Sequence, residues 1–86
     1  MKSFRTIVSE FSKFMLECEA VSRRDPILKT RLHEIAKQIM RECDRKHPYE
    51  IDHQRSIAIM ETFIERATHC MTARARELEH ANRGAA

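Results

Sequence analysis

The sequence has few residues that interrupt helices, since its 86 residues include one glycine and two prolines. A sheet built from hairpins needs such residues at its turns, so this shortage argues against a β-rich fold. Tryptophan is absent, aromatic residues make up 6% of the chain, and charged residues make up 34%. Apolar and polar residues do not alternate in runs, and these features together predict an all-α protein.

Cysteine is also scarce, and three cysteines cannot all pair within one chain. No apolar run reaches the length of a membrane span, and no basic start followed by an apolar run marks a signal peptide. We therefore expect a cytoplasmic protein with reduced thiols, no cofactor and no membrane partner.

No long stretch carries charge of one sign. The 16 Lys and Arg residues exceed the 13 Asp and Glu residues by three, and the two signs are interleaved along the chain. That mixture is typical of a solvated helical surface. A chain this short predicts one domain, residues 1–86, with a core small enough to gain stability from a partner.

Three helices are predicted, at about residues 3–23, 26–46 and 49–82, with a disordered tail at 83–86. Ser3 and Asp25 suit helix N-caps, and Pro26 suits the first position of the second helix. Apolar residues recur at steps of three and four in each helix, beginning with Phe4, Ile7, Phe11, Phe14, Cys18 and Val21. The fold expected is a small antiparallel (up-down-up) bundle with a long C-terminal helix.

The third helix has a wide apolar arc. Its heptad positions are Ile57, Met60, Ile64, Ala67, Met71, Leu78 and Ala81, and Ile59, Phe63 and Cys70 add a flank. Helices with so wide an arc usually pack against more than one neighbour. Its greater length also predicts that residues 72–82 have no partner within the chain. Both features predict a homodimer, with a different protein as the alternative cover.

The stretch RECDRKHPYEIDH, residues 41–53, raises the question of a metal site. Cys43 and His47 stand four residues apart, and His53 follows. Zinc sites usually combine two short-spaced ligand pairs, whereas one Cys-x3-His spacing followed by Pro48 is typical of a turn between helices. We predict that Cys43 is a core thiol, and a metal site remains the alternative.

Nothing in the sequence indicates catalysis. The five histidines are scattered, no glycine-rich phosphate loop is present, and Glu61 and Glu65 lie on a polar helix face. We therefore expect that the protein is not an enzyme.

A basic stripe runs along the second helix at four-residue steps, through His33, Lys37, Arg41 and Arg45. Such a stripe could follow the phosphates of a nucleic acid. Nucleic-acid binding through Lys37, Arg41 and Arg45 is thus the alternative function.

The leading hypothesis is a regulatory protein-interaction module. It would block or chaperone a partner such as a transcription regulator or a secretion component. In type, the profile is similar to small anti-activators and secretion chaperones, although no motif carries that likeness. Leu16 lies opposite the apolar stripe of the first helix, and Leu78 lies in the predicted overhang. The predicted partner surface comprises Leu16, Ala20, Arg74, Leu78 and Ala81.

Overall fold

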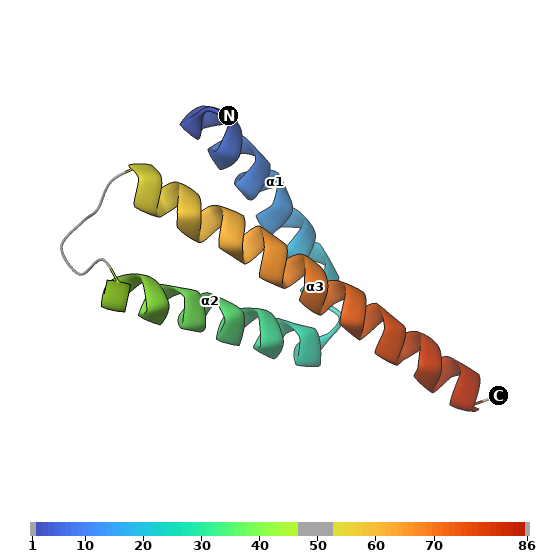
Figure 1. The fold of residues 1–86 in the computed structure, drawn as a ribbon. Helices are drawn as coiled ribbons and strands as arrows, with labels where there is room; N and C mark the ends of the chain where they lie inside the picture. Colours follow the sequence, from blue (N-terminus) through green and yellow to red (C-terminus); the bar gives the residue numbers. More distant parts are fainter. Residues whose placement is uncertain (1, 47–52, 86) are drawn as a thin grey trace.

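The computed structural model describes residues 2–46 and 53–85, and all its regular secondary structure there is helical (Figure 1). The helices are α1 (Phe4–Ser22), α2 (Pro26–Lys46) and α3 (His53–Ala85). The predicted all-α class and the predicted number of helices are confirmed for this part of the chain. No helix in the described ranges has both the length and the apolar character needed to cross a membrane.

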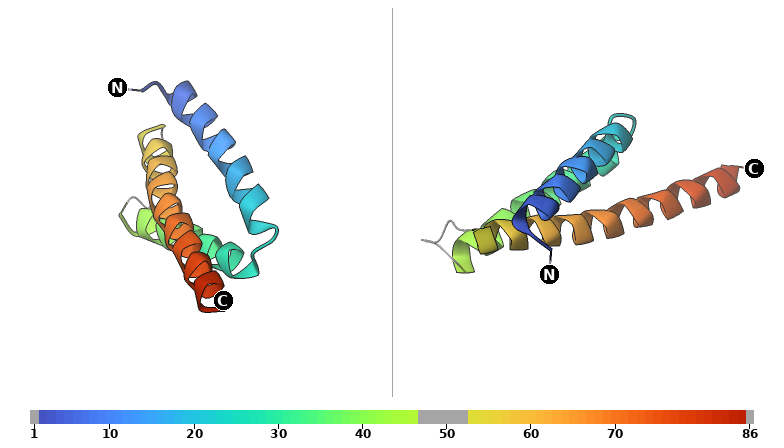
Figure 2. Two further views of the ribbon diagram at one scale, coloured as in Figure 1. Left: turned by 90° about the vertical axis from the view of Figure 1, so that its right-hand side faces the viewer. Right: turned by 90° about the horizontal axis from the view of Figure 1, so that it is seen from above.

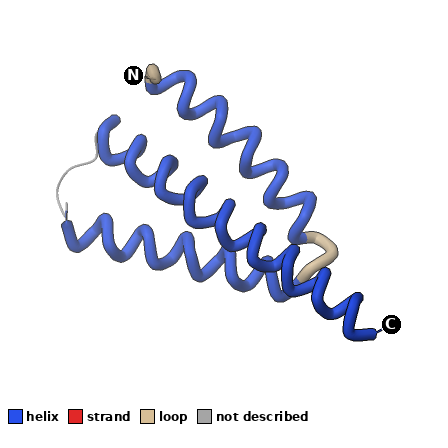
Figure 3. Tube along the Cα trace, turned by 45° about the vertical axis from the view of Figure 1, so that its right-hand side comes forward, coloured by secondary structure: helices blue, strands red, loops and turns tan. Residues whose placement is uncertain are grey.

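The three helices alternate in direction, and α3 packs against both of the others (Figures 1 and 2). By contrast, α1 and α2 make few contacts with each other. They meet at their connecting turn and diverge away from it (Figure 3). The wide apolar arc of α3 is therefore used within the chain, since it faces two neighbouring helices.

The first two helices begin where their capping residues predict. The backbone N–H of Thr6 donates to the Ser3 hydroxyl at 3.2 Å, and that of Leu28 donates to the Asp25 carboxylate at 3.2 Å. Each bond satisfies a backbone donor that has no partner inside its helix. Local chemistry thus explains why the connection between α1 and α2 is so short.

The core forms where α3 crosses the other two helices. It comprises Cys18, Leu28, Leu32, Ile39, Phe63 and Ala67. Phe63 is the aromatic centre, because Phe11 and Phe14 approach it edge-on with ring centroids 5.9 and 6.1 Å away. Leu28 and Ala67 are 1% and 0% exposed, so the helices pack tightly at this point.

The expected overhang of α3 is shorter than predicted. Arg74 Nε donates to Asp25 Oδ2 at 2.7 Å, and Arg31 Nη1 donates to Glu77 Oε1 at 2.8 Å. The prediction that residues 72–82 lack an intramolecular partner is therefore wrong as far as Glu77. The described part of α3 begins at His53.

The C-terminal end of α3 projects past the other two helices (Figure 1). Among the described residues, Glu77 makes the last ion pair from α3 to α2, and the residues after it are called the projecting end. This end is helical as far as Ala85, although a disordered tail was expected from residue 83. Arg83 pairs with Glu79 at 2.7 Å one turn earlier, an arrangement that supports a helical end.

Candidate functional site

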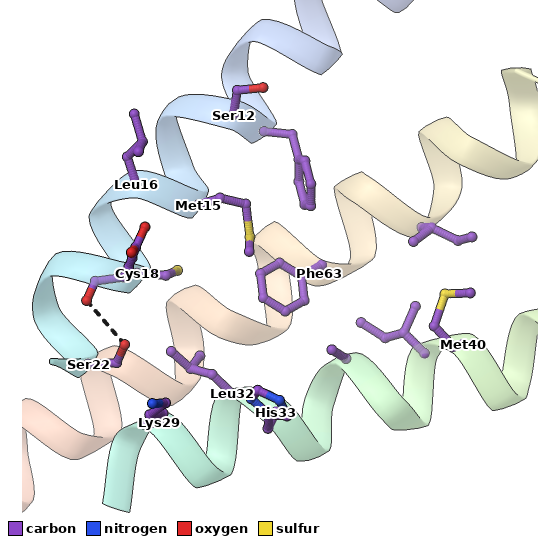
Figure 4. A pocket seen from close by; sticks show the side chains of 15 residues that line it. Ser12, Met15, Leu16, Cys18, Ser22, Lys29, Leu32, His33, Met40 and Phe63 are labelled. Carbon is purple, nitrogen blue, oxygen red and sulfur yellow. Dashed lines mark hydrogen bonds between the residues drawn. The ribbon is translucent and has the colours of Figure 1, made fainter. Parts of the chain in front are cut away.

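An apolar groove lies between α1 and α2, with α3 as its floor (Figure 4). It encloses about 530 Å³. The groove is lined by Phe11, Ser12, Met15, Leu16, Cys18, Glu19 and Ser22 of α1, by Lys29, Leu32, His33, Ala36, Ile39 and Met40 of α2, and by Ile59 and Phe63 of α3.

Two methionines form the facing walls of this groove. Met15 points from α1 toward Phe63, and Met40 rises from α2 on the other side (Figure 4). They are 41% and 46% exposed, although both occupy positions in apolar stripes. Because methionine is flexible and polarizable, such walls can adapt to an apolar guest of irregular shape.

The groove exists because three helices do not close the bundle. The apolar stripes of α1 and α2 both turn toward α3, and the two helices diverge from the turn at residues 23–25. The side chains of Met15 and Met40 are consequently exposed to solvent on the side that a fourth helix would cover in a closed bundle. A contiguous exposed apolar surface often marks an interaction site, whereas single exposed apolar residues are common on any protein surface.

The α2 wall of the groove is basic. Lys29 and His33 line the groove itself, and a shallower hollow beside it is lined by His33, Ala36, Lys37, Met40 and Arg41. The α1 wall instead has Glu19 and two hydroxyls, and the Ser22 hydroxyl donates to the Glu19 carbonyl at 3.3 Å (Figure 4). The two walls thus differ in charge while sharing an apolar floor.

The residues predicted from sequence to bind a partner do not form one surface. Leu16 is 67% exposed and lies at the rim of the groove, pointing away from Phe63 (Figure 4). Ala20 is exposed one turn further along α1, outside the groove lining. Leu78 is 44% exposed, and with the exposed Ala81 it lies on the projecting end of α3.

Arg74, the fifth predicted residue, is part of an intramolecular ion-pair network. Its side chain is 15% exposed and the Asp25 side chain is 13% exposed. Arg74 also donates to Glu77 at 3.0 Å, and Glu77 accepts from Arg31. Hydrogen bonding from Arg74 lowers the pKa of Asp25, and bonds from Arg31 and Arg74 lower the pKa of Glu77. This network ties the C-terminal half of α3 to the beginning of α2.

The predicted basic stripe of α2 is on the surface, since Lys37, Arg41 and Arg45 are all exposed. Lys37 Nζ lies 3.7 Å from Glu34. The acidic neighbours Glu42 and Asp44 instead pair with α3, through Arg66 at 3.1 Å and through Arg55.

The cysteines lie in the packed interior or at its edge. Cys18 is buried, while Cys43 and Cys70 are half-buried, and all three are free. Burial raises the pKa of the Cys18 and Cys70 thiols, so the protonated, unreactive form is favoured. The Cys43 sulfur accepts from Arg55 Nε at 2.9 Å.

The metal alternative has no support from the described residues. His47 lies outside them, and residues 2–46 and 53–85 contain no group of three or more His, Cys, Asp or Glu side chains able to hold a metal ion. His53 stacks on the Phe4 ring, with centroids 4.2 Å apart.

The partner surface predicted from the sequence does not include Met15 and Met40, because their places in the apolar stripes of the first two helices favour core positions. One signal was available: methionine is frequent at adaptable binding surfaces. No known protein family, curated protein or solved structure matches this chain.

Proposed function

We propose that this protein is a helical interaction module that binds a helix of a partner protein in the groove between α1 and α2. The observation that carries this proposal is the open apolar groove with Met15 and Met40 exposed on facing walls. A guest helix would take the place of the missing fourth helix. It would bury its apolar face against the floor around Phe63.

The dimensions of the groove support a helical guest. Along α2 it extends from Lys29 to Met40, about 16 Å at the rise of an α-helix. That length matches about three turns, which can present anchors at positions i, i+3, i+4 and i+7. An extended strand would instead need a free sheet edge, and the described residues form no sheet.

Covering an apolar helix of another protein would have regulatory consequences. The covered face could no longer contact its usual target, so the module would block a transcription regulator or chaperone a secretion component until release. The three free cysteines support a reducing cytoplasm as its setting. The apolar lining supports binding rather than catalysis.

The groove can be tested with a helical probe of neutral charge. The probe is a cross-linked peptide of about 14 residues, with leucines at i, i+3, i+4 and i+7 and glutamine elsewhere. Titration into isotopically labelled protein should shift the amide resonances of residues that line the groove. Met40→Glu should weaken this binding by about tenfold or more, because it places a charge against an apolar guest.

A matched control is available on the same helix. Ile27 is 50% exposed, close to the 46% of Met40, and it does not line the groove. Ile27→Glu should therefore bind the neutral probe like the parent. Absence of probe binding at millimolar concentration, or equal weakening by both substitutions, would contradict the proposed function.

Homodimer formation remains a prediction, now carried by the projecting end of α3. Light scattering at micromolar concentration should give twice the chain mass of 10.2 kDa. Leu78→Glu should restore the monomer mass, since it replaces the large aliphatic side chain of that end with a charge. A parent protein that stays monomeric on concentration would rule out the homodimer.

Nucleic-acid binding is the second candidate, because Lys37, Arg41 and Arg45 are exposed on one helix. Phosphate contacts by these side chains would give strongly salt-dependent affinity without sequence preference. That mode would leave the adjoining apolar groove without a role, so we place it second.

A further inference from the structure

We infer that the guest of the groove is an amphipathic helix with acidic residues along the flank that faces α2. This inference rests on the proposed function and adds the chemistry of the partner. It follows from the difference in charge between the α1 wall and the α2 wall. It also follows from the surfaces of this chain, because none of them has both the shape and the charge to fill the groove of a second copy.

The α2 wall carries a row of basic groups beside the apolar lining. Lys29, His33, Lys37 and Arg41 follow one another at four-residue steps, and all four are exposed. Residues four apart share a helix face, so these side chains border the groove and its adjoining hollow. Within the described ranges, Lys29 and Arg41 have no ion-pair partner, and Lys37 has only the 3.7 Å contact with Glu34.

The α1 wall gives the guest an orientation. Its lining includes the hydroxyls of Ser12 and Ser22 and the Glu19 carboxylate, which lies 3.4 Å from the Arg23 guanidinium, so this wall has no excess of positive charge. A guest with acidic residues on one flank would place that flank beside α2 and its polar or basic flank beside Glu19. The reverse orientation would place the polar or basic flank beside the basic α2 wall, where like charges repel.

A second copy of this chain is a poorer guest. The projecting end of α3 has one large aliphatic side chain, Leu78, and its charges balance, because Arg83 pairs with Glu79. A partly acidic surface does exist between α1 and α3, where Glu61, Glu65 and the ion pair of Lys2 with Glu10 border apolar residues. That surface is itself a hollow, so it cannot enter another hollow.

The charge preference can be measured with three probes that differ only along one flank. The cross-linked leucine-stripe peptide is made with glutamate, glutamine or lysine at the flanking positions. At about 50 mM salt the glutamate peptide should bind at least tenfold more tightly than the glutamine peptide, and the lysine peptide should bind most weakly. The differences in affinity among the three peptides should become smaller at about 500 mM salt, where exposed charges are screened.

Charge reversal on α2 provides the decisive comparison. The double substitution Lys37→Glu with Arg41→Glu should abolish the preference for the glutamate peptide. Arg5→Glu with Lys13→Glu changes the net charge equally at exposed positions of α1 outside the groove lining, and it should retain the preference.

The outcomes separate the inference from the proposed function. Equal binding of all three peptides, still lost in Met40→Glu, would overturn the acidic guest and leave the helix-binding groove intact. Failure of all three peptides to bind would overturn both. Equal loss of the preference in both double variants would overturn the inference, since net charge alone would then explain it. Tighter binding of a DNA or RNA duplex than of the glutamate peptide, lost in the α2 double variant, would overturn it in favour of nucleic acid.

Discussion

Phe63→Ala should lower the free energy of unfolding by about 3–5 kcal/mol, the usual cost of truncating a buried phenylalanine. Phe63 is 7% exposed, belongs to the core cluster, and receives the edges of both Phe11 and Phe14. Its removal would leave a cavity at the point where all three helices meet. Urea unfolding followed by circular dichroism measures the loss directly.

Small domains are stable by about 5–15 kcal/mol, so this one substitution should remove a large part of the stability of the fold. Leu16→Ala is the matched control, because Leu16 is 67% exposed and contributes little to the core. Its unfolding free energy should stay within about 0.5 kcal/mol of the parent. Equal stability of the two variants would show that Phe63 is not the centre of the core.

The sequence predicted α1 and α2 closely because their limits depend on local chemistry. Ser3 accepts from the third residue after it, and Asp25 followed by Pro26 both ends one connection and begins the next helix. These interactions involve residues that are close in the chain, so they can be recognised from the amino-acid sequence. The predicted connection around His47 and Pro48 lies outside the described residues.

The groove could not be predicted in the same way. The positions of Met15 and Met40 in apolar stripes show only that these residues face other helices. Whether a fourth surface covers them depends on the angle at which α1 and α2 diverge, and helix periodicity carries no information about that angle. An apolar stripe has the same sequence pattern whether it is covered by another helix of the chain or by a partner protein.

Arg74 illustrates a second limit. The sequence places it near Leu78, where it predicts a charged residue at the rim of an exposed partner surface. Its actual role depends on the register between α2 and α3, which brings it beside Asp25, 49 residues away in the chain. That register depends on tertiary packing and on the connection between the helices, and neither is encoded by residue spacing within one helix.

Arg74→Met should lower the thermal midpoint at about pH 7 by several degrees, because it leaves the Asp25 carboxylate without its cation. Methionine keeps the length and apolar stem of arginine, so the loss should report the ion pairs to Asp25 and Glu77 rather than packing. Thermal unfolding followed by circular dichroism measures the midpoint. Arg83→Met is the control, since its pair with Glu79 is solvent-exposed and should contribute almost nothing.

The same substitution should change how stability depends on pH. The hydrogen bond from Arg74 lowers the pKa of Asp25, and bonds from Arg31 and Arg74 lower the pKa of Glu77. Carboxylates with a lowered pKa in the folded state stabilise it fully above their ordinary pKa near 4, and this contribution disappears as the pH falls through the folded-state values. The midpoints of parent and Arg74→Met should therefore differ most near pH 7 and converge as the pH falls through the folded-state pKa values of Asp25 and Glu77. A difference that stays constant over this range would mean that Arg74 stabilises the fold through packing instead of through its charge.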